Sequence, residues 1–411
     1  MQNDRVQFAL IGAGGMGMGD ARYQTDLGSV IVAVADLYDG RLARAKEIWG
    51  SQIQTTRDYR EVLARKDVDA VIIATPDHWH SRITIDALQA GKDVYCEKPM
   101  VQKIDQGHEV IEAHKKTDRI LQIGSQYASS LVYQKARELL QAGSIGKLNM
   151  VEAWLDRNTA IGAWQYSIPP DASEQTIDWD RFLGNAPKRP FDAVRFFRWR
   201  NYRDYGTGVA GDLFVHLLTG LHFSTGVQGP NRVYATGGLR YWKDGRDVPD
   251  VMLATMDYPG FTLRLRVNFK SSEPQERFGF QFVGSEGTLT TSYNDVLLAR
   301  HPRETQPGYT IETFPEAIQK EFLAEYHRKY PQARATADGM RPDKDEHYVA
   351  PREHDAHLEH HRNFLTAVRT RKPFLEDGVF GLRAAGPALL TNTSYYEQRI
   401  CHWDSEAMTA S

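Results

Sequence analysis

The stretch Gly12-Ala13-Gly14-Gly15-Met16-Gly17 matches the pattern G-x-G-x-x-G. It follows an apolar run at residues 6–11 that is typical of a strand, and it opens a predicted helix. A second apolar run ends at Asp36, nineteen residues after Gly17. Strand, glycine-rich turn, helix and a downstream acidic residue in this order predict a dinucleotide-binding turn. The alternative is a glycine-rich turn that binds no ligand.

Each glycine of this turn has a physical task in a dinucleotide site. Gly12 permits the tight turn, Gly14 lets backbone N–H groups approach the pyrophosphate, and Gly17 allows the helix to pack closely. Gly15 and Met16 begin the helix, whose amino-terminal end favours an anion. We therefore expect all five residues to contact the cofactor.

Asp36 indicates which cofactor binds. Its carboxylate can accept hydrogen bonds from both adenosine ribose hydroxyls, and its charge would repel a 2′-phosphate. NAD is the expected cofactor. NADP remains the alternative because Arg41 lies five residues further on and could soften that repulsion.

Strand-like and helix-like segments alternate through the first third of the chain. Short apolar runs of this kind suit strands that are buried on both faces of a parallel sheet. The predicted strands are residues 6–11, 31–35, 70–74, 93–96 and 120–124. The helices between and after them are predicted at residues 40–49, 57–65, 81–90 and 104–117. This alternation predicts a doubly wound parallel sheet, a Rossmann domain, over residues 1–126.

The pattern changes beyond Gly124. From residue 231 apolar and polar residues alternate, and turn signals separate the runs. We expect residues 127–411 to form an α+β domain with a large, mostly antiparallel open sheet. Its predicted helices are residues 131–141, 208–220, 357–370 and 380–398, and the last two are expected to pack back on the Rossmann domain.

Composition excludes several classes of protein. The 411 residues include 50 Lys and Arg against 53 Asp and Glu, a near-neutral balance that gives no support for a nucleic-acid or membrane-surface partner. Two cysteines form neither a disulfide framework nor a structural zinc site. No apolar run is long enough for a transmembrane helix. Residues 1–6 show no signal-peptide pattern, so we expect a cytoplasmic protein; a periplasmic one is the alternative if a signal has been removed.

A carboxylate and an imidazole lie one helical turn apart after the glycine-rich residues 208–211. On a helix, Asp212 and His216 share one face. His216 could accept a proton from a substrate hydroxyl as general base, while Asp212 binds a hydroxyl and favours the imidazolium. The alternative is a helix-start carboxylate at Asp212 with a packed histidine at His216.

Taken together, these motifs resemble the glucose–fructose oxidoreductase, inositol dehydrogenase and rhizopine-catabolism family (Gfo/Idh/MocA). The residues that carry the resemblance extend over nearly the whole chain. They are the turn at 12–17, Thr75-Pro76 with His80, Glu97-Lys98-Pro99, Asp212-x-x-x-His216, the turn at 284–289, and the tail from 360–365 through Trp403-Asp404. The resemblance implies a nicotinamide cofactor and the oxidation or reduction of a hydroxyl-bearing carbon, usually of a sugar, polyol or inositol.

The resemblance also implies roles for single residues. Lys98 would be the active-site lysine, placed by Glu97, and Asp212 and His216 would be catalytic. Besides the glycine-rich turn and Asp36, the expected cofactor contacts are Thr75, Pro76, His80, Glu97 and Lys98. The Lys98–Pro99 bond is often cis in relatives.

Two features concern the substrate. After Gln126, where many relatives carry an arginine shortly beyond, this chain has Tyr127, which offers a hydroxyl and a stacking face but no cation. Eleven of the 52 residues from Trp154 to Tyr205 are aromatic, with arginines between them. Because this density is about twice the chain average of 11%, we predict a substrate-side wall with Trp164, Arg200 and Tyr202; core or subunit interface is the alternative. The expected substrate contacts are therefore seven residues: Lys98, Tyr127, Trp164, Arg200, Tyr202, Asp212 and His216.

The histidines at 354, 357, 360 and 361 are interpreted as one face of an amphipathic helix, so no metal site is expected. The Cys96 thiol is expected to be buried, with a raised pKa. Too few helices are predicted to cover both faces of the second sheet, and a face carrying Phe278, Phe280 and Phe282, or their opposite neighbours, would be left apolar. We therefore expect a homodimer or homotetramer through that sheet, unless residues 301–355 fold over it.

The sequence thus predicts an NAD-dependent oxidoreductase that acts on a secondary alcohol of a sugar, glycoside or polyol. One alternative is an NAD-dependent glycosidase that oxidises the sugar transiently and eliminates the aglycone. The other is a cofactor-bound binding protein without catalysis, which would tolerate the loss of Lys98 or His216, yet both are present.

Overall fold

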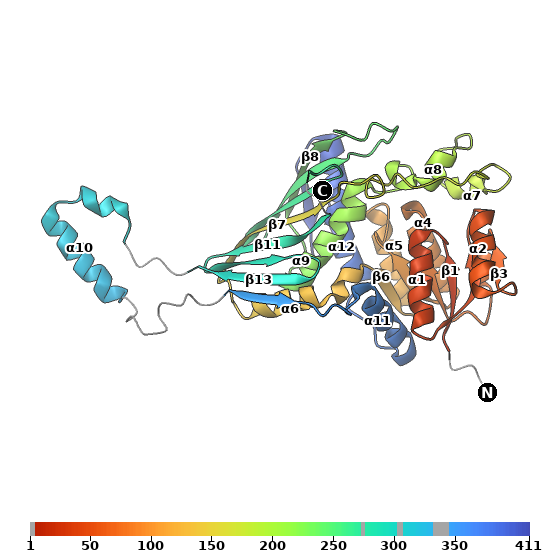
Figure 1. The fold of residues 1–411 in the computed structure, drawn as a ribbon, viewed down its shortest axis with the longest axis horizontal. Coiled ribbons are helices and arrows are strands. Elements are labelled where there is room, and N and C mark those ends of the chain that lie inside the picture. The colour runs from red at the N-terminus through yellow and green to blue at the C-terminus, as the bar shows by residue number, and fades with distance from the viewer. Residues whose placement is uncertain (1–4, 273–275, 302–306, 332–344) are drawn as a thin grey trace.

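Two sheets organise the chain. The computed structural model describes residues 5–272, 276–301, 307–331 and 345–411. The first sheet and its helices contain the amino terminus, and the second sheet continues beside them (Figure 1). The predicted fold class, a Rossmann sheet followed by a large mostly antiparallel sheet, is confirmed.

The first sheet has six parallel strands in the order β3-β2-β1-β4-β5-β6. This order reverses direction beside β1, and such a switch point is where doubly wound sheets bind nucleotides. The strands are β1 (Gln7–Ile11), β2 (Val30–Ala35), β3 (Gln54–Thr56), β4 (Ala70–Ile73), β5 (Asp93–Glu97) and β6 (Leu121–Gly124). Sequence analysis did not expect β3, because a polar three-residue edge strand carries no apolar run.

Helices pack around this sheet. They are α1 (Gly15–Asp26), α2 (Asp39–Trp49), α3 (Tyr59–Leu63), α4 (Asp77–Gln89) and α5 (Asp105–Lys116). The amino end of α1 follows the glycine-rich turn directly, so its free N–H groups lie at the carboxyl edge of the sheet.

The second sheet has ten strands in the order β14-β13-β12-β11-β7-β10-β9-β8-β15-β16. Apart from the parallel pair β7 and β10, its neighbours are antiparallel. The strands are β7 (Leu148–Asp156), β8 (Arg232–Gly238), β9 (Val251–Tyr258), β10 (Phe261–Asn268), β11 (Arg277–Gly284), β12 (Gly287–Thr291), β13 (Asp295–Arg300), β14 (Glu346–Val349), β15 (Cys401–Asp404) and β16 (Thr409–Ala410).

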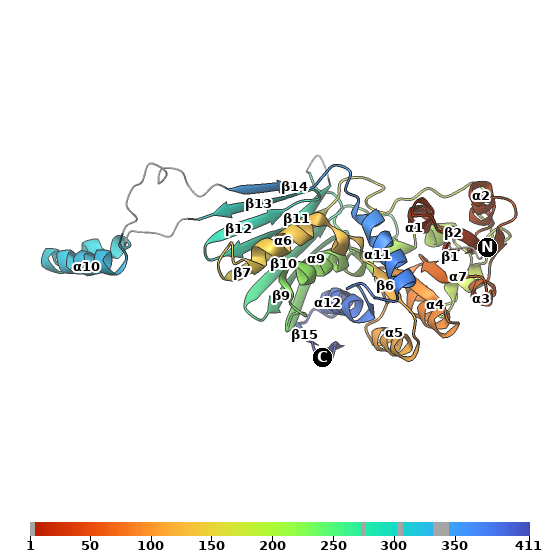
Figure 2. The same cartoon turned by 90° about the horizontal axis from the view of Figure 1, so that it is seen from below.

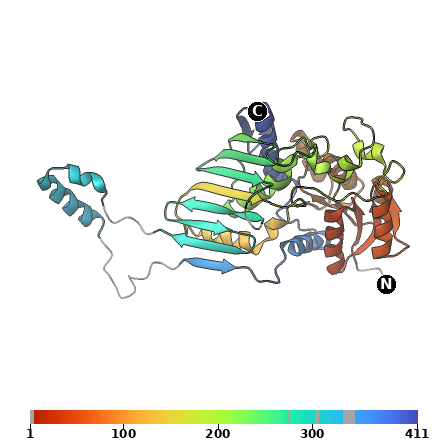
Figure 3. The ribbon, with the colours of Figure 1, turned by 45° about the horizontal axis from the view of Figure 1, so that its top comes forward.

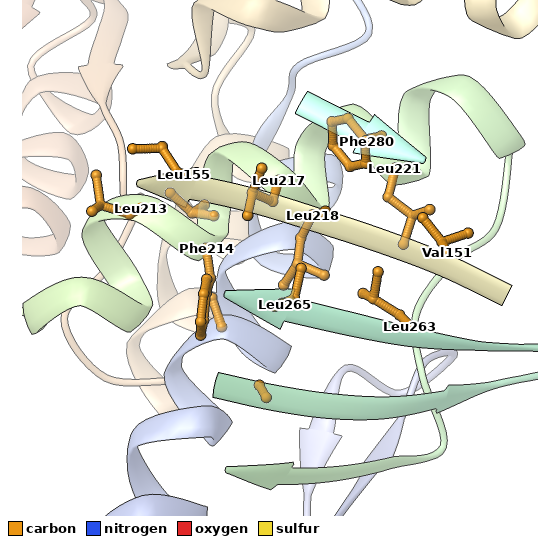
Figure 4. Packing of buried hydrophobic residues seen from close by; sticks show 14 of the residues in the cluster. Val151, Leu155, Leu213, Phe214, Leu217, Leu218, Leu221, Leu263, Leu265 and Phe280 are labelled. Atoms are coloured by element: carbon orange, nitrogen blue, oxygen red, sulfur yellow. The ribbon is translucent and has the colours of Figure 1, made fainter. Parts of the chain in front are cut away.

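Helices cover one face of this second sheet (Figure 2). They are α6 (Leu131–Gln141), α9 (Val215–Thr225) and α12 (Gly378–Glu397), with the short turn η1 (Gln126–Ser129) and the π-helix η3 (Ala210–Phe214). Leucines of α9 pack on the inward-facing side chains of β7 and β10, and Phe280 of β11 lies in the same cluster (Figure 4). This cluster is the core of the second domain.

Phe278, Phe280 and Phe282 lie on the covered face and are buried there, so they form no exposed patch. The face that stays uncovered is thus that of their opposite neighbours, because α6 and α9 cover the phenylalanine face. The opposite face is mixed: Glu152 and Arg264 form an ion pair across it, beside partly exposed apolar side chains such as Met150.

The insertion between β13 and β14 points away from the body. Its described part contains η4 (Tyr309–Thr313) and α10 (Glu316–Lys329) and stands off the end of the sheet (Figures 1 and 3). None of the residues of α10 is buried. This described part does not fold over the sheet.

The carboxyl-terminal helices return to the first domain. The helix α11 (Ala356–Thr370) lies against α1, where His361 stacks on Tyr23 with ring centroids 5.4 Å apart. The helix α12 contacts α5 and β6, and just before it the Ile123 N–H donates to the Glu376 carbonyl. Among the described residues, no helix combines the length and apolar character that crossing a bilayer requires.

Candidate active site

Two glycines of the glycine-rich turn, Gly12 and Gly17, leave no room for a side chain. Gly12 has a φ of +93°, and a Cβ there would lie 2.7 Å from the carbonyl carbon of Ala74. A Cβ on Gly17 would lie 2.1 Å from the Gly12 carbonyl oxygen, so α1 packs directly on the turn. The turn therefore offers bare backbone and a helix amino terminus to an anion.

Asp36 braces the turn from the end of β2. Its Oδ2 accepts a hydrogen bond of 2.7 Å from the Ala13 N–H, and its Oδ1 accepts one of 2.9 Å from the Tyr38 N–H. Arg41 Nη1 lies 3.4 Å from the same Oδ2. The carboxylate thus lies where a ribose would be recognised, with a guanidinium beside it.

A cavity of about 630 Å³ opens at this edge of the sheet. The first domain lines it with predicted cofactor residues, namely Gly12, Gly14, Gly15, Met16, Asp36, Thr75 and Pro76. The opposite wall includes Phe182, Phe196, Phe197, Trp199 and Arg200 from the second part of the chain. The bare turn, the helix end, the acid and the volume together fit a dinucleotide.

Residues 171–205, which we call the strap, form that opposite wall. They contain α7 (Trp179–Leu183), α8 (Ala193–Phe197) and η2 (Trp199–Asn201), and they cross above the first domain (Figure 1). The strap pairs with the loop after β2: the Asp39 N–H donates to the Thr176 carbonyl and the Asp178 N–H to the Leu37 carbonyl, both at 2.9 Å. Five of the eleven aromatic residues of the segment line this cavity, namely Tyr166, Phe182, Phe196, Phe197 and Trp199.

The strap is fastened at the other side of the cavity too. His78 Nε2 lies 2.7 Å from the Phe182 carbonyl oxygen, and the Trp79 indole N–H donates to the same oxygen at 3.1 Å. Tyr38 and Phe197 meet edge to face, with centroids 5.4 Å apart. Both rims of the cavity are thus bonded to the strap.

Two predicted substrate contacts are placed elsewhere. Trp164 is 1% exposed, and its ring meets Phe269 edge to face in the core of the second domain. Tyr202 is buried in the aromatic cluster of the strap, under the guanidinium of Arg195. Neither lines the cavity, because both rings are used for packing.

Lys98, Asp212 and Arg200 meet beside the cavity. Lys98 Nζ donates to the Asp212 side-chain Oδ1 and to the Asp212 carbonyl oxygen, both at 2.9 Å. Arg200 Nε donates to the same Oδ1 at 3.2 Å. Lys98 comes from the end of β5, just before a cis bond to Pro99, whereas Asp212 comes from η3. The two predicted catalytic residues are therefore in direct contact across the domains.

A buried carboxylate fastens η3 to the first domain. Asp77, at the start of α4, accepts hydrogen bonds from the backbone N–H and the hydroxyl of Thr207 at 2.9 and 2.7 Å. Burial, and then the charge of Asp212, raise the pKa of Asp77 to about 7. This contact holds the segment that leads into Asp212 close to Lys98.

The charge pattern makes Asp212 anionic and His216 neutral. Burial raises the pKa of the Asp212 carboxyl, but Lys98 and Arg200 outweigh burial and hold it well below its usual range. Burial, and then the charge of Lys98, lower the pKa of the His216 imidazole well below 6.5, although Asp212 opposes them. Asp212 thus favours the imidazolium, as expected, but burial and the charge of Lys98 outweigh it and leave the imidazole neutral.

His216 has a free ring nitrogen. Its Nδ1 is buried and has no hydrogen-bond partner among the described residues. The ring of Tyr127 meets it edge to face, with centroids 5.5 Å apart, and Tyr127 also stacks near Phe278. A neutral imidazole with an unpartnered nitrogen is ready to accept a proton.

Two other predicted cofactor contacts, His80 and Glu97, lie next to the cavity and bond to the backbone or side chains around it. His80 lies between the carbonyl oxygens of Thr75 at 2.8 Å and Pro99 at 2.7 Å, fully buried, and does not line the cavity. Glu97 is buried and accepts from the Gln126 amide, and burial raises its pKa well above the usual range. Both hold the two strand ends in place, and direct contact of these two residues with the cofactor stays a prediction. Gly17 and Lys98 also lie outside the cavity lining.

The remaining titratable groups follow the expectation of packing. The Cys96 thiol is fully buried, and burial raises its pKa to about 12. His360 and His361 are buried against β6 and α1, where His361 Nε2 lies 3.1 Å from Asp20 Oδ1. Within the described ranges, no group of three His, Cys, Asp or Glu side chains could hold a metal ion.

Several cavity residues were not found by sequence analysis. Tyr59, Trp79, Tyr166 and Phe197 line the cavity, but none was singled out for the cofactor. Only Trp79 had a usable signal, because it lies between Pro76 and His80, which sequence analysis had singled out. Tyr59 reaches the cavity from α3, Phe197 from the strap and Tyr166 from the loop before the strap.

Two family models match the chain. The model of the oxidoreductase family with an NAD-binding Rossmann fold (GFO_IDH_MocA) matches residues 6–125, and the GFO/IDH/MocA C-terminal domain matches residues 181–290. Inositol 2-dehydrogenase 4 of Saccharopolyspora erythraea is 33% identical over 200 residues, 48% of this chain and 55% of that protein. Inositol 2-dehydrogenase of Rhodococcus erythropolis is 31% identical over 189 residues, 44% and 53% of the two chains. The chain thus spans about half the length of the curated relatives it matches.

Solved structures share the fold. A levoglucosan dehydrogenase in complex with NADH has a TM-score of 0.68 at 17% identity, covering 97% of this chain and 98% of that one. The WlbA dehydrogenase from Bordetella pertussis, in complex with NADH and UDP-GlcNAcA, has a TM-score of 0.69 at 16% identity, covering 96% and 98%. At these identities the likeness concerns the fold. With both domain models matched, the chain belongs to the Gfo/Idh/MocA family of NAD-binding oxidoreductases.

Proposed function

We propose that this protein is an NAD-dependent oxidoreductase that moves a hydride between nicotinamide and a secondary alcohol carbon of a sugar, glycoside or polyol. The observation that carries the proposal is the contact of Lys98 with Asp212 beside the dinucleotide cavity, one helical turn from the unpartnered nitrogen of His216. The family membership and the similarity to inositol 2-dehydrogenases support the same chemistry.

The roles of the three residues follow from their charges. The His216 imidazole accepts the hydroxyl proton of the substrate, since its lowered pKa keeps the ring neutral and able to accept. Asp212 orients the same hydroxyl, and Lys98 holds Asp212 and relays the proton. When bound, nicotinamide supplies the hydride acceptor at C4. Tyr127 and Arg200 are the further side chains that we assign to the substrate end.

The cofactor end is assigned to the first domain. We propose that residues 1–126 bind the nucleotide and residues 127–411 carry the substrate side and the assembly surface. Direct contacts are assigned to Gly12, Gly14, Gly15, Met16, Asp36, Thr75 and Pro76, all of which line the cavity. Gly17, His80 and Glu97 act by holding that backbone in place.

A panel of monosaccharides, polyols and glycosides tests the proposal. The purified protein is mixed with each compound and NAD or NADP, and the absorbance of the reduced cofactor is followed. We expect reduced cofactor to accumulate with NAD and at least one compound that carries a secondary alcohol. The absence of accumulation and of product with every compound would contradict the proposal.

One observation favours the glycosidase as a second candidate. The strap is bonded to both rims of the cavity, which suits a cofactor that stays bound and is restored within each cycle. The same panel separates the two activities, because a glycosidase releases the aglycone while the amount of NAD stays constant.

We also propose that copies of the chain associate through the uncovered face of the ten-stranded sheet as a homodimer or homotetramer. Met150, Tyr234 and Leu297 point from this face and are 38%, 48% and 41% exposed. Packing two such faces across a two-fold axis would remove them from water. Light scattering at micromolar concentration checks this, and a mass near the single-chain 46.7 kDa would contradict it.

A further inference from the structure

We propose that Arg200, besides the substrate contact assigned to it above, acts as a positioning residue that links closure of the strap over the nucleotide to the orientation of the Asp212 carboxylate. Binding of the nucleotide and alignment of the catalytic site then both depend on the position of the strap. The catalytic half of this inference rests on the proposed function, whereas the nucleotide half does not.

The strap begins at the adenosine side of the cavity. Tyr38 Oη donates to Asp171 Oδ1 at 2.5 Å, and Arg57 Nη2 donates to the Gln175 carbonyl at 2.9 Å. Tyr38 lies only two residues beyond Asp36, which is the expected ribose contact. These bonds therefore hold the start of the strap beside the nucleotide, far in sequence from the catalytic residues.

The strap ends at the catalytic side. Arg200 lines the nucleotide cavity, its guanidinium carbon lies 4.2 Å from the ring centre of Trp199, and its Nε bonds to Asp212. Its side chain is 22% exposed, against 6% for Asp212. One guanidinium thus faces both the cofactor cavity and the catalytic carboxylate.

Asp212 is held by cations from two separate parts of the chain. Lys98 belongs to the end of β5 and Arg200 to the strap, and both donate to the same oxygen. Loss of one partner of a buried, hydrogen-bonded charge is costly, because the remaining charge is left poorly compensated. The position of the strap and the position of the carboxylate therefore bias each other, and such coupling is reciprocal.

Reciprocity gives a test that needs no carbohydrate. The rate of NADH release is measured by stopped-flow fluorescence for the wild type, Asp212→Asn, Arg200→Met and the double variant. Asp212 does not line the nucleotide cavity, yet we expect Asp212→Asn to speed NADH release about fivefold, as the loss of a charged hydrogen bond predicts. In the Arg200→Met background the same substitution should add less than about twofold, because the link is already broken.

Asp171→Asn and Glu174→Gln provide the reference and the control. Asp171→Asn weakens the fastening at the far end and should speed NADH release by about fivefold. Glu174 is an exposed strap residue, so the matched change from acid to amide should leave the release rate at the wild-type value. Arg200→Lys, which retains a cation, should restore part of the slow release that Arg200→Met loses.

The turnover number kcat provides a second test of the coupling. At saturating NAD, Asp171→Asn should lower kcat about threefold in the wild type but not in the Arg200→Met background. Equal factors in both backgrounds, or NADH release that Asp212→Asn leaves unchanged, would overturn the coupling. If no carbohydrate is turned over, the proposed function fails, but the NADH release rates still decide whether Arg200 couples the two ends.

Discussion

The glycine-rich turn and the strap form opposite walls of the same cavity, but they are specified in different ways. The turn is built by six consecutive residues, and steric contacts explain why Gly12 and Gly17 carry no side chain. The strap contains 35 residues, from 171 to 205, and is held by hydrogen bonds to residues of the first domain more than a hundred positions away in sequence. A local motif thus identifies the ligand, whereas a distributed set of contacts determines how that ligand is enclosed.

Breaking the turn should have the largest effect. A valine at Gly17 would place Cβ 2.1 Å from the Gly12 carbonyl oxygen, so the turn cannot keep its shape. We expect NADH affinity to fall at least about a hundredfold in Gly17→Val, measured by fluorescence titration. Gly19→Val is the matched control, because a Cβ on Gly19 meets open space on the same helix. Similar affinities for the two variants would show that the turn tolerates side chains.

Removing the lysine should affect turnover rather than binding. We expect Lys98→Met to lower kcat about a hundredfold, the usual scale for a group that takes part in proton transfer. NADH affinity should change by less than about threefold, since the pyrophosphate is held by backbone N–H groups of the turn. A near-normal kcat would reduce Lys98 to a scaffold for Asp212.

The preference for NAD over NADP should depend on Asp36, which follows β2, and on Arg41 of α2. With the Asp36 carboxylate at the ribose position, we expect kcat/KM to favour NAD over NADP at least about tenfold, or about 1.4 kcal/mol. Asp36→Ala should narrow this ratio, and Arg41→Ala should widen it, because Arg41 lies beside the same carboxylate. Equal kcat/KM values of the wild type with NAD and NADP would contradict the assignment of Asp36 as the ribose contact.

A single strap contact should matter less than the turn. Tyr38→Phe removes the hydroxyl that donates to Asp171 but keeps the ring against Phe197. We expect NADH affinity to fall about fivefold, the equivalent of about 1 kcal/mol for one hydrogen bond. Tyr241→Phe, on an exposed ring far from the cavity lining, is the control. An unchanged affinity in Tyr38→Phe would mean that the strap does not help to hold the nucleotide.

The pH dependence should show the smallest change. The pKa of His216 is lowered, so its proton-accepting form is lost only as the pH falls through a value below 6.5. We expect kcat/KM for alcohol oxidation to change less than about twofold between pH 8 and 6.5. The pKa of the neighbouring Asp77 carboxyl is about 7. The variant Asp77→Asn removes this titration, so the pH profile that remains reports on His216. An acid limb centred above pH 7 in both proteins would contradict a buried neutral His216.

Sequence reasoning was strongest where chemistry is local. The apolar runs predicted five of the six strands of the first sheet, because buried parallel strands consist of little else. The i, i+4 spacing brought Asp212 and His216 to one short segment, although η3 forms a π-helix rather than the expected regular helix. Spacing along the chain does not predict the contact between Lys98 and Asp212, because that contact depends on how the two domains meet.

The failures of sequence reasoning concern residues whose chemistry fits two environments. Trp164 and Tyr202 have the same aromatic character as Phe197, but only Phe197 lines the cavity. The balance of charge at His216 was also out of reach, since burial and Lys98, which comes from the first domain, outweigh the favourable charge of Asp212. Side-chain type indicates what a residue can do, whereas tertiary contacts determine which of those options is used.

Transfer of a label from carbohydrate to cofactor tests the central claim most directly. A compound that reduces NAD in the panel is prepared with deuterium on the carbon that bears the reacting hydroxyl, and the NADH formed is analysed by mass spectrometry. If Lys98, Asp212 and His216 align this carbon with the nicotinamide, the NADH carries the deuterium. Formation of the oxidised carbohydrate with unlabelled NADH would contradict the account.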